Sequence, residues 1–96
     1  MSDTDNLLVG RSRVLMEQPV DDEMFGLESE NGNFYGFNAP AARIWALIEQ
    51  PRSLAAICAA LVEEFEVAPA TCRADTLAVL RQLEADGLVT LMPAGA

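Results

Sequence analysis

The sequence has no histidine and only two cysteines, Cys58 and Cys72, among its 96 residues. Without histidine, the chain lacks the commonest general base, the usual activator of a nucleophile and the commonest metal ligand. Two widely separated cysteines are too few for a disulfide framework or a zinc site. Both lie within or beside apolar helical segments, so we expect buried free thiols.

Basic residues are also scarce. The chain has six arginines and no lysine against 15 aspartates and glutamates, which gives a formal net charge of −9 at pH 7 and an isoelectric point of about 4.1. Proteins that bind a phosphate backbone take most of their affinity from lysine and arginine. The charge balance therefore argues against binding to nucleic acid or to an anionic membrane. The acidic charge either serves only to keep the protein soluble or attracts a partner with a basic surface.

Long apolar runs and targeting signals are absent from the sequence. No apolar stretch approaches the roughly 18 residues of a membrane helix, and no charged-then-apolar signal opens the chain. Hydrophobic residues make up 51% of the chain, which is too many for a disordered protein. We therefore predict a single cytoplasmic domain over residues 1–96, with an ordered core over about residues 11–91.

The sequence also lacks a recognisable catalytic constellation. Its six glycines are scattered, so there is no glycine-rich phosphate loop. The carboxylate pairs Asp21–Asp22 and Glu63–Glu64 are chain neighbours, and neighbours on a helix do not face each other. Ser53 has no histidine partner and is better explained as a helix cap. We expect no catalytic residue, no metal and no cofactor. An enzyme or redox protein that uses Cys58 or Cys72 is kept as an alternative.

The first half of the chain has the pattern of an antiparallel sheet. Arg11–Met16 and Glu23–Glu28 are predicted strands. The dipeptide Asn31-Gly32 is a strong signal for a two-residue hairpin turn, because both residues tolerate positive φ. Asn33–Phe37 is the predicted returning strand. A shift of the turn by one residue would exchange the aromatic side chains that face inward, and the sequence leaves this register open.

From Asn38 onward the apolar residues recur at helical spacing. Asn38 is a predicted N-cap, and Pro40 suits the first turn of a helix, where its missing N–H would have no partner anyway. This helix is expected to end near Gln50. Ser53 is the predicted cap of a second helix, whose apolar positions follow the amphipathic spacing.

The segment Pro69–Thr71 is expected to break the chain and to cap a third helix. That helix should end near Asp86, with Gly87 as its stop, and Leu88–Leu91 could add a short extended segment. The predicted fold class is therefore α+β, with a three-stranded antiparallel sheet followed by three helices. The second and third helices resemble the helix-turn-helix half of a winged-helix domain.

A winged-helix transcriptional regulator is accordingly a second hypothesis. It predicts a basic recognition helix. The third helix offers only Arg73 and Arg81 against Asp75, Glu84 and Asp86, so the pattern argues against this hypothesis.

The predicted strand Asn33–Phe37 has the features of an unprotected sheet edge, and the functional prediction depends on it. A small sheet has at least one edge with unpaired backbone groups, and proteins usually protect such an edge with lysine, proline or a bulge. Asn33–Phe37 has no charge and no proline. Either another element covers this strand, or an extended peptide adds to it and places alternate side chains in pockets. Gly36 would permit close approach of a neighbour, although it could equally mark a bulge.

Several segments in fixed order resemble the PqqD-like proteins, which are peptide chaperones also called RiPP recognition elements. The resemblance covers roughly Val14 to Leu91. It includes Tyr35-Gly36-Phe37-Asn38, Ala42–Ile48, Pro51–Leu54, Asp75–Leu83 and Asp86-Gly87-Leu88-Val89. The chain looks closer to the stand-alone recognition proteins of lasso peptide systems than to the quinone-pathway member.

The resemblance implies a non-catalytic function. Proteins of this family bind the leader segment of a ribosomally made precursor peptide and present it to a peptide-modifying enzyme, such as a leader protease or a radical SAM enzyme. The leader adds to the third strand in a groove whose other wall is the third helix. On this sequence the implied peptide-binding residues are Asn33, Phe34, Tyr35, Gly36, Phe37, Asp75, Ala78, Val79 and Gln82.

Within that implied groove, Asp75 would pair with a basic or hydroxyl-bearing leader side chain, and Ala78 and Val79 would shape an apolar pocket. Thr76, Leu80 and Leu83 would point to the core. The chain departs from the family pattern at Phe37, where leucine is usual, and at Pro40, where threonine or glycine is common. The family's leader motif therefore cannot be carried over. A protein-interaction module of another kind is the remaining alternative.

Overall fold

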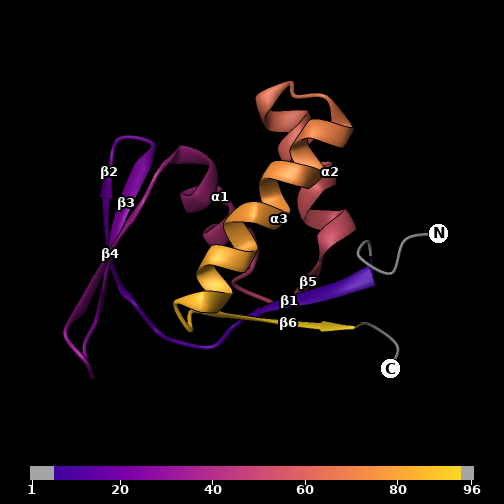
Figure 1. Ribbon diagram of the computed structural model, residues 1–96. Coiled ribbons are helices and arrows are strands. Elements are labelled where there is room, and N and C mark those ends of the chain that lie inside the picture. The colour runs from indigo at the N-terminus through magenta and orange to yellow at the C-terminus, as the bar shows by residue number, and fades with distance from the viewer. Residues whose placement is uncertain (1–5, 94–96) are drawn as a thin grey trace.

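The computed structural model describes residues 6–93, which form three helices and two small antiparallel sheets. The fold class is α+β, as predicted. Figure 1 shows one sheet standing to one side of the helices and the other lying beneath them. The elements in chain order are β1 (Leu7–Arg11), β2 (Met16–Val20), β3 (Glu23–Glu28), β4 (Asn33–Phe37), α1 (Ala39–Leu47), β5 (Arg52–Ser53), α2 (Leu54–Phe65), α3 (Pro69–Ala85) and β6 (Val89–Pro93).

The sheet β2-β3-β4 contains the predicted hairpin. Both of its strands, Glu23–Glu28 and Asn33–Phe37, have the predicted bounds. The predicted two-residue turn is wrong, because Glu28 pairs with Asn33 across a four-residue loop. Gly32 has a φ of +70°, and its N–H donates to the Glu28 carbonyl at 2.8 Å. Asn31 instead donates its side-chain amide to the Glu28 carboxylate at 3.0 Å.

The predicted strand Arg11–Met16 is also wrong. Arg11 ends β1, Met16 begins β2, and residues 12–15 connect the two sheets. Contacts from distant parts of the chain hold this link: the Ser12 N–H donates to the Leu88 carbonyl at 2.9 Å, and Leu15 is buried. The first strand of the predicted sheet is therefore β2, which contains Pro19. Proline is tolerated there because β2 is an edge strand.

The second sheet, with strand order β5-β1-β6, has no counterpart in the prediction. Its central strand β1 pairs with β6 from Leu7–Pro93 to Arg11–Val89, and β6 contains most of the extended segment expected at Leu88–Leu91. The short β5 pairs on the other side of β1, with Ser53 opposite Leu8. Both pairings join segments that lie far apart in the sequence.

The helix caps follow the local sequence. The Asn38 side chain accepts from the Ala41 N–H at 3.0 Å, and the Ser53 hydroxyl accepts from the Ala56 N–H at 3.1 Å, which confirms both predicted caps. Gly87, with a φ of +77°, follows the last turn of α3, as predicted. The Pro69–Thr71 segment does not cap α3, because Pro69 is its first residue and the N-cap position is Ala68.

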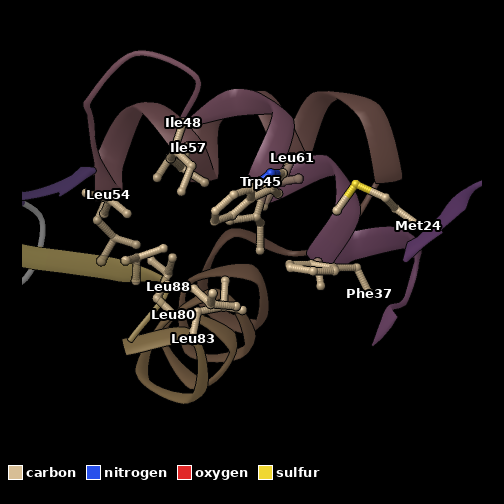
Figure 2. Packing of buried hydrophobic residues seen from close by; sticks show 14 of the residues in the cluster. Met24, Phe37, Trp45, Ile48, Leu54, Ile57, Leu61, Leu80, Leu83 and Leu88 are labelled. Atoms are coloured by element: carbon tan, nitrogen blue, oxygen red, sulfur yellow. The ribbon is translucent and has the colours of Figure 1, made fainter. Parts of the chain in front are cut away.

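The core lies between the helices and the inner faces of the two sheets. Trp45 is completely buried at its centre, with α1 and α2 residues on one side and Leu80, Leu83 and Leu88 on the other (Figure 2). The expected core residues Thr76, Leu80 and Leu83 are all buried. Within residues 6–93, none of the helices is long and apolar enough to cross a membrane.

Candidate functional site

The strand β4 lies at an open edge of its sheet. The strand order is β2-β3-β4, and no strand within the described part of the chain pairs with the outer side of β4. The opposite edge, β2, carries Glu17 and Pro19, which are residues that discourage the addition of another strand. β4 has neither a charged residue nor a proline. Of the two edges, β4 is therefore the one suited to pair with an added strand.

A groove of about 460 Å³ separates β4 from the C-terminal half of α3. Six of the predicted residues line it, namely Phe34, Tyr35, Gly36, Phe37, Val79 and Gln82. Four further lining residues were missed by sequence reasoning: Asn38, Ala41, Leu83 and Asp86. The sequence analysis assigned Asn38 to capping and Leu83 to the core. Leu83 and Asp86 each lie one helical turn after a predicted groove residue, and this spacing was the signal that could have found them.

The aromatic side chains of β4 divide between the two faces of the sheet. Phe37 is buried with its ring centroid 5.6 Å from that of Trp45, and Tyr35 is half-buried on the same face. Phe34 points to the opposite face, where it stacks on Phe25 at a centroid distance of 5.3 Å and an interplanar angle of 19°. The structure thus decides the register that the sequence left open.

The other three predicted residues do not line the groove. Asn33 begins β4, and its side-chain amide lies 3.5 Å from the Glu28 carboxylate. Ala78 is exposed on α3 and lines neither of the two cavities beside this helix. Asp75 lines a second cavity, one turn further toward the N-terminus of α3. A role in binding for these three residues stays a prediction.

The second cavity, of about 210 Å³, lies between the three helices and adjoins the groove at Val79, which lines both. Its wall is almost wholly apolar and comes from residues distant in sequence: Pro40, Ile44, Leu61, Phe65, Val67, Cys72, Thr76 and Val79. Among the described residues that line it, Asp75 alone carries a carboxylate. Such a pocket fits an apolar side chain that ends in a hydroxyl or a positive charge.

The charge of both cavities favours neutral or cationic ligands. Asp86 and Asp75 each contribute a carboxylate, and none of the described residues that line either cavity is basic. Gln82 donates its side-chain amide to Asp86 at 3.4 Å. An acidic ligand would find no positive partner at these walls.

The thiols have the character of structural groups. Cys72 is buried, as predicted, whereas Cys58 is only half-buried. Burial raises the pKa of the Cys58 thiol, and the neighbouring Cys72 raises it further. A thiol with a raised pKa is protonated near neutral pH and is a weak nucleophile. Among residues 6–93, no cluster of three or more histidine, cysteine, aspartate or glutamate side chains is placed to hold a metal ion.

The model of one protein family, coenzyme PQQ synthesis protein D (PqqD), matches residues 23–89. The chain belongs to the PqqD family. The matched residues take in β3, β4 and all three helices, and they include every residue that lines the groove. This confirms the resemblance to PqqD-like proteins.

A solved structure, TbiB1 in complex with the TbiA(beta) leader peptide, is similar to this member of the PqqD family. The two chains are 29% identical, and the alignment covers 83% of this chain and 93% of TbiB1 with a TM-score of 0.73. None of the curated proteins matches the chain.

Proposed function

We propose that this protein binds the leader segment of a ribosomally synthesised precursor peptide and delivers it to a modifying enzyme. The observation that carries the proposal is the open edge of β4 beside the groove of α3. An extended peptide that pairs with β4 would gain backbone hydrogen bonds along the strand and would place every second side chain in the groove. The protein itself would do no chemistry.

Two findings support a leader peptide as the ligand. The chain belongs to the PqqD family, and a similar structure, TbiB1, holds a leader peptide. The walls of the groove and of the adjoining cavity suit a peptide with apolar anchors and a hydroxyl or basic group near Asp75. One or two such anchors usually dominate the affinity of an interface of this kind.

The proposal includes the finer expectations drawn from the sequence. We propose a single leader-binding domain over residues 1–96, with a winged helix-turn-helix relationship, acting in the cytoplasm. A leader protease of a lasso-type system or a radical SAM enzyme would be its enzyme partner. Phe37 and Pro40, the departures from the family pattern, lie respectively in the groove and in the adjoining cavity, so the leader motif should be particular to this chain.

Hydrogen exchange tests the binding mode directly. Synthetic leader segments from short open reading frames beside the gene are added to the protein, and amide exchange is followed residue by residue. We expect exchange to slow in β4, because an added strand protects its outward amides. A scrambled leader serves as the control peptide. Tight binding with unchanged exchange in β4 would reject strand addition while keeping the ligand.

A pair of α3 variants tests the groove. Val79→Glu places a charge in its apolar wall, and we expect leader affinity to fall at least about tenfold. Ala85→Glu adds the same charge on the same helix at an exposed position outside the groove and should leave affinity unchanged. Circular dichroism checks that both variants fold. Equal affinities for the two variants would mean that the leader binds elsewhere.

A further inference from the structure

The sheet β2-β3-β4 has a second face that the core does not use. Met24 and Gly26 of β3 are buried, so the alternating residues Phe25 and Leu27 point away from the helices. The cross-strand register extends this outer face to both neighbouring strands, since Met16 and Phe34 lie opposite Leu27. In Figure 1 the three helices lie to one side of this sheet.

The outer face is largely apolar, with Gln18 opposite Phe25 as a polar residue between Met16 and Val20. Its hydrophobic side chains remain exposed by 64% at Met16, 44% at Val20, 37% at Phe25, 36% at Leu27 and 65% at Phe34. Gly36 lies opposite Phe25 and adds no side chain there; a Cβ atom at Gly36 would lie 3.5 Å from the Phe25 ring. Monomeric proteins rarely expose a contiguous apolar patch of this kind without a binding role.

The rim of the outer face is acidic. The β2–β3 turn places Asp21 and Asp22 at one end, and Glu23, opposite Val20, extends the charge onto the face itself. Glu30 lies in the loop at the other end. Two arginines lie near this rim and both are paired: Arg13 with the buried carboxylate of Glu28 at 2.9 Å, and Arg43, which lines a cavity with Asp21 and Asp22, with Glu64 at 2.8 Å. The face therefore presents an apolar centre with a negative border.

A second copy of the chain fits this face poorly. Two copies placed face to face would bring two acidic rims together, and each chain carries a net charge of −9. Like charges set opposite each other across an interface are costly. The complementary partner is a surface with an apolar centre and a border of arginine or lysine.

We infer that this outer face is the docking surface for the peptide-modifying enzyme, which would present an apolar patch bordered by arginine or lysine. The choice of this partner rests on the proposed function. The position suits delivery, because Phe34 belongs both to the outer face and to the groove. An enzyme on this face lies directly beside a peptide added to β4.

The experiment measures affinity between this protein and the purified peptide-modifying enzyme encoded beside its gene. The variant Met16→Gln/Val20→Thr changes two exposed residues of β2, away from the groove. The matched control, Leu8→Gln/Met92→Gln, changes a cross-strand pair on the other sheet with exposures of 39% and 58%. We expect enzyme affinity to fall at least tenfold for the β2 variant and to stay within twofold for the control.

A second pair of variants tests the acidic rim and changes no apolar side chain. It therefore still tests enzyme docking on the outer face if the β2 variant fails to fold. Asp22→Asn/Glu23→Gln should weaken enzyme binding and flatten its dependence on salt. Glu63→Gln/Glu84→Gln, which removes the same charge from α2 and α3, should do neither. Equal loss in the test and control variants would overturn the proposal, as would no enzyme binding at all.

Two further measurements distinguish failure of the docking surface from failure of leader binding in the groove. Leader binding is measured on the same variants and should be unchanged. A wild-type chain that binds the enzyme through this face but binds no leader would reject the groove function and support the docking surface. Sedimentation of the protein alone checks the competing occupant, because a dimer that Met16→Gln/Val20→Thr dissociates would assign the face to a second copy and overturn the inference.

Discussion

Gly26 lies on the inner face of β3, where Leu15 from the link between the two sheets packs against its backbone. A Cβ atom at this position would lie 2.7 Å from Leu15 Cδ1 and 3.3 Å from Leu15 Cβ. Leu15 is buried and cannot move without disturbing the core. The glycine is therefore required by a close approach between segments and not by a turn.

Gly26→Ala should destabilise the protein by about 1–3 kcal/mol, the usual effect of adding a methyl group to a packed site. The free energy of unfolding is measured by urea titration. Gly10→Ala is the matched control, because a Cβ there meets only Thr90 Oγ1 at 3.7 Å and Pro51 Cγ at 3.9 Å. Similar effects of the two substitutions would show that strand propensity, and not the Leu15 contact, sets the cost.

The Cys58 thiol makes stability depend on pH. Its folded-state pKa lies above the ordinary value of 9.0, mainly because burial disfavours the thiolate. Stability from this group is fully present below 9.0 and is lost as pH rises through the folded-state value, because the unfolded chain releases its proton first. The urea midpoint should therefore fall more steeply above about pH 9 in the wild type than in Cys58→Ala. If the urea midpoints of the two proteins fall in parallel with pH, Cys58 does not contribute to the pH dependence.

Among the elements, α2 and α3 begin differently although both follow short breaks in the chain. Ser53 caps α2 through its hydroxyl, which accepts the Ala56 N–H. α3 begins at Pro69 after Ala68 and has no side-chain cap. A serine or aspartate at a helix start satisfies an N–H that would otherwise have no partner in the helix.

Ser53→Ala should cost about 1 kcal/mol of stability, because the first turn of α2 loses its cap. Thr71→Ala, at the exposed start of α3, is the control and should cost less than about 0.5 kcal/mol. Thermal unfolding of both variants provides the measurement. A Thr71→Ala effect as large as that of Ser53→Ala would contradict the assignment of the caps.

At the scale of the whole molecule, one arginine ties the two sheets to the same helix. Arg11, the last residue of β1, places its guanidinium 4.3 Å from the centroid of the Trp45 ring and donates Nη2–H to the Trp45 carbonyl at 2.6 Å. Glu17 of β2 lies 3.7 Å from Arg11 Nη1 and accepts the Trp45 indole N–H at 3.3 Å. The cluster therefore holds β1, β2 and α1 together.

Arg11→Lys should lower stability by about 1–2 kcal/mol, because lysine cannot both cover the ring and keep the hydrogen bonds of the planar guanidinium. Arg52→Lys is the matched control: Arg52 also donates to a backbone carbonyl, that of Leu47 at 2.6 Å, but it is exposed and bridges no sheets. Urea unfolding compares the two. A smaller loss for Arg11→Lys than for Arg52→Lys would reject the role of the cluster.

Sequence reasoning placed β3, β4 and the caps at Asn38 and Ser53, and the family resemblance supplied six residues of the groove. Sequence reasoning misplaced the first strand at Arg11–Met16. Residues 12–15 form a link between the sheets because Ser12 bonds to Leu88 and Leu15 packs on Gly26, and neither distant contact can be read from the local sequence. The resemblance to PqqD-like proteins also implied that Asp75 lies in the groove. The structure puts Asp75 in the neighbouring cavity, whose other walls come from α1 and α2.

The sequence by itself determined the helices, the caps of α1 and α2 and the two strands of the β3–β4 hairpin, because backbone preferences, capping groups and apolar periodicity act between near neighbours in the chain. Only the tertiary structure decided that β4 is an open edge, which aromatic residues face the groove and how the second sheet forms. These features depend on pairings between distant segments, such as Leu8 with Met92, and on where α3 comes to lie beside β4. Such pairings follow from packing of the whole chain, which no local pattern encodes.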